Sequence, residues 1–183
     1  MIRLYAAFDE VWWAARLNLL WFLGTLAGGV VLGVGPATVA AYTLARRHAQ
    51  GESFSPWRAF FAAYRREFRR GSLLVLPLAV CFLVTTNVVV LLLLAVITAY
   101  LLPMYVHFDL RVRDCLPKAS LFAITRPASS VVLLFALLAV AFAVSRLPFL
   151  LPTLAVGGWI QLNTWLVLRF FAENEALLLA KGN

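Results

Sequence analysis

The stretch Ser55–Arg70, SPWRAFFAAYRREFRR, predicts an amphipathic helix around which the rest of the chain is organised. Aromatic residues recur in it at i, i+3, i+4, i+7 and i+11, so they share one helix face: Trp57, Phe60, Phe61, Tyr64 and Phe68. The arginines fall mostly off that face: Arg58, Arg65, Arg66, Arg69 and Arg70. An aromatic face opposite a basic one is typical of a helix that lies in a membrane interface.

The two ends of this stretch fit the same interpretation. Ser55 is suited to the N-cap position, and Pro56 to the first helical position, where its missing N–H costs no hydrogen bond. Arginine-rich segments stay on the cytoplasmic side of a membrane. We therefore expect the helix 55–70 to lie on the inner leaflet against anionic lipids. Its candidate lipid or partner surface is Trp57, Arg58, Phe61, Arg65, Arg66, Arg69 and Arg70.

The composition is that of an integral membrane protein. Of the 183 residues, 63% are hydrophobic and 13% are charged, against about 25% charged in a typical soluble domain. Sixteen basic and eight acidic residues give a net charge of +8. In a soluble protein that excess would suggest nucleic-acid binding. Here the retention of basic residues on the inner side of the membrane explains it, so no nucleic-acid partner is expected.

Charged residues divide the chain into four uncharged runs, 17–45, 71–108, 127–145 and 147–168. A helix needs about 20 residues to cross a bilayer. The last two runs are therefore one crossing each, and 71–108 makes two crossings with a turn at Thr85-Thr86-Asn87. In the first run, Gly33–Pro36 predicts a break between two helices.

The predicted fold is all-α, a polytopic membrane helix bundle with cytoplasmic interfacial amphipathic helices. A single integral membrane domain, 1–183, contains six helical segments arranged as three hairpins. The segments cover about 11–33, 36–48, 72–86, 88–108, 127–146 and 152–171. Both termini are then cytoplasmic, and nearly all basic residues share one side, with Arg146 outside. Five spans, with the N-terminus outside, is the alternative.

The sequence carries no pattern of reactive side chains that indicates an enzyme. All eight carboxylates fall at or beyond the edges of the apolar runs, so no buried pair is available for acid–base chemistry. Neither His48 nor His107 has a neighbour at metal-ligand spacing, and nothing pairs Cys81 with Cys115. We therefore predict no catalytic residue, no metal site and no cofactor.

Polar and small residues at membrane depth allow two interpretations. Helix-to-helix hydrogen bonding is the favoured one, with Gly28-Gly29 and Gly157-Gly158 as close helix-packing points. The sharper hypothesis is a polar pocket at the start of a short helix, where unpaired N–H groups would face a ligand. The candidate pocket residues are Asn18, Gly35, Pro36, Thr38, Gln161 and Asn163.

Several short motifs resemble the YesL family of small bacterial membrane proteins, a domain of unknown function. They are Asn18-Leu19-Leu20-Trp21, Gly35-Pro36-Ala37-Thr38, Ala40-Ala41-Tyr42, Gly51-Glu52 and the Phe/Arg helix at 60–69. The resemblance implies a multi-pass protein of the bacterial cytoplasmic membrane and a link to carbohydrate uptake or its regulation. It supplies no catalytic or binding residue.

The predicted function is that of a non-enzymatic accessory or scaffold membrane protein. Its expected partners are a bilayer with anionic lipids and, by the resemblance, a component of a sugar-uptake transporter. The basic segments 46–70 and 109–127 would form the recognition surface on the cytoplasmic side. The alternative is a transporter or channel for a small polar solute that uses the candidate pocket.

Overall fold

Helices account for nearly all of the computed structural model, which describes residues 2–108 and 111–181, with side chains for 8–108 and 111–173. This described part contains eight α-helices, one short π-helix and no strand, so the predicted all-α class is confirmed. The elements are α1 (Ile2–Ala27), α2 (Val31–Ala49), α3 (Pro56–Arg66), α4 (Phe68–Val84), α5 (Val88–Phe108), α6 (Val112–Thr125), α7 (Pro127–Arg146), η1 (Leu151–Ala155) and α8 (Val156–Lys181).

The first hairpin turns at Gly28–Val30 and not at the predicted Gly33–Pro36. Gly29 has a φ of +71°, a left-handed conformation that glycine adopts without strain and that lets the chain reverse after Ala27. Pro36 lies inside α2, where it cannot donate to the Leu32 carbonyl. The hydroxyl of Ser72 on α4 lies 3.2 Å from that carbonyl and 2.7 Å from the Phe68 carbonyl, so the two carbonyls share one donor.

The predicted helix 55–70 is divided at Glu67 into α3 and the first turn of α4. Its N-terminal signals are confirmed, since Ser55 occupies the N-cap position with an extended backbone and Pro56 opens α3. The aromatic face, however, does not all point outward. Phe60 and Tyr64 are buried, because Gly24 of α1 leaves room for the Phe60 ring.

The turn predicted at Thr85–Asn87 is confirmed, since α4 ends at Val84 and α5 begins at Val88. The Asn87 side chain caps α5, with its Oδ1 accepting from the N–H of Val89 at 3.0 Å and of Val90 at 3.3 Å. The segments 88–108 and 127–146 coincide with α5 and α7. The last predicted segment, 152–171, consists of η1 followed by α8, which continues to Lys181.

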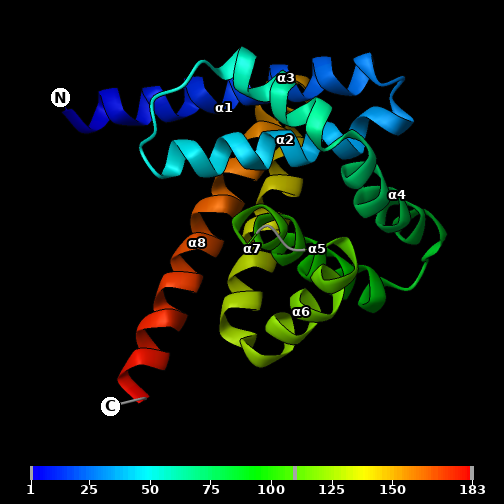
Figure 1. Cartoon of the computed structure of the whole chain (residues 1–183), viewed down its shortest axis with the longest axis vertical. Coiled ribbons are helices and arrows are strands. Elements are labelled where there is room, and N and C mark those ends of the chain that lie inside the picture. The colour runs from blue at the N-terminus through cyan, green and yellow to red at the C-terminus, as the bar shows by residue number, and fades with distance from the viewer. Residues whose placement is uncertain (1, 109–110, 182–183) are drawn as a thin grey trace.

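Figure 1 shows α1 and α2 side by side with α3 packed against them, while α8 runs from this hairpin to the far end of the molecule. The core lies where α2, α5 and α8 meet. There the Asn163 amide of α8 donates to the Tyr42 hydroxyl at 2.8 Å and to the Ala99 carbonyl at 3.0 Å. One fully buried side chain thus joins three helices.

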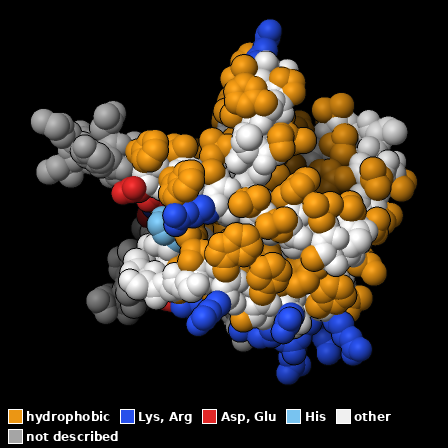
Figure 2. Space-filling model, turned by 90° about the horizontal axis from the view of Figure 1, so that it is seen from above, with side chains coloured by type: hydrophobic (Ala, Val, Ile, Leu, Met, Phe, Trp, Pro, Cys, Tyr) orange, Lys and Arg blue, Asp and Glu red, His pale blue; other side chains and the backbone are white. Residues whose placement is uncertain are grey.

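Two helices in the described part of the chain, α5 and α7, are long and apolar enough to cross a membrane. Of the residues of α7, all of which are described, only Leu133 is buried. A core helix of a soluble protein would bury one full face. Large apolar side chains are instead exposed along it: Val131, Val132, Phe135, Leu138 and Phe142. Hydrophobic side chains also cover most of the face in Figure 2.

Candidate functional site

The six residues of the predicted polar pocket do not converge on one cavity. Asn18 is buried and caps the start of α8, with its Oδ1 accepting from the N–H of Val156 and of Gly157, both at 3.0 Å. Its amide nitrogen donates to the Pro152 carbonyl at 2.6 Å. Every polar atom of this side chain is therefore used to hold α1 against the last helix.

Thr38, Gly35 and Pro36 also serve helix packing. The Trp21 indole N–H donates to Thr38 Oγ1 at 2.9 Å, which joins α1 to α2. A Cβ on Gly35 would lie 2.7 Å from the Gly71 carbonyl oxygen, so α2 and α4 touch through their backbones. With Asn163 in the core, these contacts are those of the helix-to-helix interpretation.

Gln161 lies elsewhere, in an open groove of about 580 Å³ between α1, α2 and α8. Its side-chain N–H donates to Glu10 Oε2, and the same carboxylate oxygen lies 3.4 Å from His48 Nε2. The His48 ring stacks on Trp13 with a centroid distance of 4.3 Å. The remainder of the groove is mainly apolar, so it offers one acid–imidazole contact at the edge of a hydrophobic surface.

A polar pocket of about 340 Å³ lies between α2, the α3–α4 junction and α5, and we call it the arginine pocket. Three guanidinium groups from α2, α3 and α4 border it together with a single carboxylate. Its lining residues are Val39, Thr43, Arg46, Arg66, Glu67, Arg70, Tyr105 and Val106.

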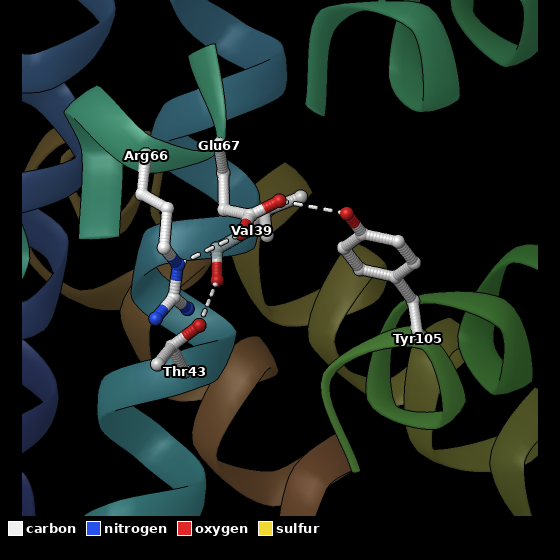
Figure 3. Close-up of polar contacts among 5 residues, drawn as sticks. All are labelled: Val39, Thr43, Arg66, Glu67 and Tyr105. Carbon is white, nitrogen blue, oxygen red and sulfur yellow. Dashed lines mark hydrogen bonds and ion pairs between the residues drawn. The ribbon is translucent and has the colours of Figure 1, made fainter. Parts of the chain in front are cut away.

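Glu67 is the buried carboxylate of this pocket and sits where α3 ends and α4 begins. Its Oε2 accepts from the Tyr105 hydroxyl at 2.7 Å, and its Oε1 accepts from Arg66 Nε at 3.0 Å (Figure 3). The positive end of the α4 dipole also favours an anion at this position. The sequence places every carboxylate at or beyond the edge of an apolar run and does not predict that Glu67 links Arg66 to Tyr105. The one available signal was a lone acid within a basic run.

Arg46 and Arg70 supply positive charge that no carboxylate of the described residues offsets. Arg46 Nη1 donates to the Val106 carbonyl at 3.0 Å, while its buried Nε has no acceptor among the described residues. Arg70 is exposed at the mouth of the pocket. Three guanidinium groups and one ionised carboxylate give the lining a net charge of +2.

The residues of the predicted lipid or partner surface lie on the outside of α3 and of the first turn of α4. Trp57 is half exposed and stacks on the half-buried Phe61, with 6.3 Å between ring centroids. The five predicted arginines are all exposed: Arg58, Arg65, Arg66, Arg69 and Arg70. Figure 2 shows a group of Lys and Arg side chains at the lower edge of the molecule.

Comparison with known proteins finds a family model and several relatives that the chain resembles. Residues 14–100 match the family model described as "Protein of unknown function, DUF624". Over 132 residues the chain is 35% identical to the uncharacterized protein YesL of Bacillus subtilis (strain 168). The chain is similar to YesL and, over somewhat less than half of its length, to the DUF624 family. The predicted resemblance is thus confirmed, and the family model covers Arg46, Arg66, Glu67 and Arg70 of the arginine pocket.

The match to YesL covers 62% of this chain and 63% of YesL, so the chain spans less than two thirds of that relative. Two further uncharacterized proteins of the same organism are similar. YesV is 29% identical over 94% of this chain and 93% of its own length, and YteU is 27% identical over 78% and 73%. No solved structure matches the chain.

Proposed function

We propose that this protein is a non-enzymatic accessory or scaffold protein of the bacterial cytoplasmic membrane that docks a partner on its cytoplasmic side. The observation that carries the proposal is the outer side of α3 and of the first turn of α4. We call it the arginine face and define it as Trp57, Arg58, Arg65 and Arg69. These side chains are exposed, and none of the three arginines is ion-paired within the described residues.

The arginine face is presented by an anchored helix. Phe60 and Tyr64 hold the opposite side of α3 in the protein interior. Arg and Trp are the side chains that most often dominate binding energy at protein interfaces. A helix that is fixed on one side and displays these side chains on the other loses little entropy when a partner binds.

Membrane insertion is the second part of the proposal, with six segments in three hairpins: α1–α2, α4–α5 and α7–α8. Besides α5 and α7, the uncharged part of α4 after Arg70, residues 71–84, is about 21 Å long, roughly two thirds of the thickness of the hydrocarbon core. Basic residues precede α4 and follow α5, so the inside preference of positive charge requires the chain to cross and return between them. The helices α3 and α6 then lie on the cytoplasmic side.

The family resemblance is the ground for naming a component of a sugar-uptake transporter as the partner. Turnover chemistry is not part of the proposal, because the sequence carries no pattern of reactive side chains that indicates an enzyme.

The docking proposal is tested by a charge-removing and a charge-keeping variant of the same three positions. The triple variant Arg58→Gln, Arg65→Gln, Arg69→Gln is expected to lose co-purification of the transporter component in mild detergent and to slow growth on the transported sugar. The matched variant with Lys at these positions keeps the charge that orients the protein. If both variants retain partner and growth, the arginines serve orientation alone and docking is wrong.

A second candidate, a transporter or channel for a small polar solute, is favoured by the groove at Gln161. Purified protein in liposomes discriminates between the two functions. Uptake of a labelled polar solute by the protein alone would replace the accessory function, whereas the docking proposal predicts no uptake above that of protein-free liposomes.

A further inference from the structure

We propose that the arginine pocket binds a phosphate monoester. The inference goes beyond the docking proposal, because it concerns the cavity behind the arginine face and requires no protein partner.

The net charge of +2 on the pocket lining is balanced by a ligand that carries two negative charges. Arg66 is paired with Glu67, whereas Arg46 and Arg70 have no carboxylate partner in the described part of the chain. A phosphate monoester has a second pKa of about 6 and therefore carries close to two negative charges at neutral pH. Carboxylates and phosphodiesters carry one and would leave half of the excess uncompensated.

The placement of the guanidinium groups suits a phosphate group, which offers several oxygens, better than a small spherical anion. Arg46 comes from α2 and Arg70 from the first turn of α4, so two guanidinium groups border the cavity from different elements. Guanidinium forks bind phosphate oxygens through paired N–H donors. The positive end of the α4 dipole lies at the same place. A volume of about 340 Å³ is at the lower end of the range for small-molecule pockets.

The contacts of Glu67 determine which groups of the pocket are left to bind a ligand. Its two oxygens are occupied by Tyr105 and Arg66, so the carboxylate fixes these groups instead of accepting from a ligand. The hydroxyl of Thr43 already donates to the Val39 carbonyl at 2.9 Å (Figure 3), so the ligand is left with the guanidinium groups of Arg46 and Arg70.

The full-length protein in a neutral detergent provides the test, by calorimetric titration with glycerol 3-phosphate. A second titration uses phosphatidylcholine vesicles with and without phosphatidic acid, the monoester lipid, and with phosphatidylglycerol, a diester. We expect binding of a monoester probe that weakens about tenfold or more in the variant Arg46→Gln, Arg70→Gln, because two charge-assisted contacts are lost. The control Arg58→Gln, Arg65→Gln removes equal charge outside the pocket.

The single variant Arg70→Gln guards against misfolding, since this side chain is exposed, and it is also expected to weaken binding. Pocket-dependent binding of glycerol 3-phosphate identifies a soluble ligand. Pocket-dependent binding confined to phosphatidic acid vesicles identifies a lipid headgroup. If neither monoester distinguishes the pocket variants from the control, or if phosphatidylglycerol binds equally well, the proposal is wrong. Since only purified protein is used, that result would leave the docking proposal untouched.

Discussion

Glu67 is a buried charged residue at a junction of three helices. It closes α3, precedes α4 and binds Tyr105 of α5 across 38 positions of sequence. A carboxylate buried in this way is strongly destabilising when its partner is removed, because the remaining polar group loses both water and its hydrogen bond.

We therefore predict that Glu67→Ala lowers the free energy of unfolding by about 1–3 kcal/mol, since the Tyr105 hydroxyl is left without its acceptor. Tyr105→Phe is expected to cost about 1 kcal/mol, and the double variant less than the sum of both. Denaturant unfolding in detergent measures these values. The control is Tyr64→Phe, because the Tyr64 hydroxyl is buried without a partner among the described residues. Additive single effects would show that the Glu67–Tyr105 contact does not couple the helices.

Cys115 on α6 supplies a pH-dependent prediction. Burial, and then the nearby Asp114 carboxylate, raise the pKa of the Cys115 thiol to about 11. At pH 8 its thiolate fraction is then about a hundredfold below that of a thiol with a pKa of 9. In a Cys81→Ala background, the rate of alkylation by iodoacetamide should still rise tenfold per pH unit at pH 10. A plateau near pH 9, as expected for the unfolded chain, would contradict the burial of Cys115.

The raised pKa of Cys115 also makes the free energy of unfolding depend on pH. The unfolded chain loses the Cys115 proton near pH 9 and the folded protein only near pH 11. This contribution to folding is therefore complete below pH 9 and is lost as the pH rises from 9 to 11.

At the scale of elements, the contact between α1 and α8 depends on one of two adjacent glycines. A Cβ on Gly157 would lie 2.1 Å from the Ala14 carbonyl oxygen, whereas on Gly158 the nearest atom would be 3.9 Å away, on Leu154. Of the pair predicted as a packing point, only Gly157 makes the close approach to α1.

We predict that Gly157→Ala destabilises the protein by about 1–3 kcal/mol, because α1 and α8 must separate. Gly158→Ala has the same gain in helix propensity and room for the methyl group, so it should be neutral or stabilise by up to about 1 kcal/mol. The midpoint of thermal unfolding in detergent compares the two. Equal effects of both substitutions would show that α1 and α8 are not in backbone contact.

Sequence reasoning located best those helices whose ends coincide with a change from apolar to charged or polar residues. Apolar runs that end at charges or at Pro127 predicted α5 and α7, and the polar Thr85–Asn87 predicted the turn. The first turn was misplaced because Gly28-Gly29 and Gly33–Pro36 both carry break signals. Pro36 lies inside α2, and the carbonyl to which it cannot donate is contacted by Ser72 of α4. Ser72 lies far away in sequence, so no local pattern indicates this contact.

The arginine pocket could not be predicted, because its groups come from separate elements. Arg46, Glu67 and Tyr105 belong to three different apolar or basic segments, and no periodicity connects them. Of the predicted polar pocket, Asn18, Thr38 and Asn163 lie at helix interfaces, and each is hydrogen-bonded to a different neighbour. Asn18 and Asn163 are examples, since they cap α8 and join α2 to α5 respectively.

At the scale of the whole molecule, the exposed apolar helices and the arginine face are the basis of the proposed orientation. Large apolar side chains are exposed on α4, α5 and α7, and such surfaces mark contact with a partner or a membrane. The proposal places them in lipid and the arginine face on the cytoplasmic side of the membrane.

Cysteine accessibility on the two sides of α4 tests this orientation most directly. In a Cys81→Ala, Cys115→Ala background, single cysteines replace Thr86 in the α4–α5 turn and Ala62 on α3, both exposed. In cells stripped of their wall, a membrane-impermeant maleimide should label Thr86→Cys at once and Ala62→Cys only after permeabilisation. Labelling of Ala62→Cys from outside, or equal labelling of both positions before permeabilisation, would contradict a membrane protein whose arginine face lies inside the cell.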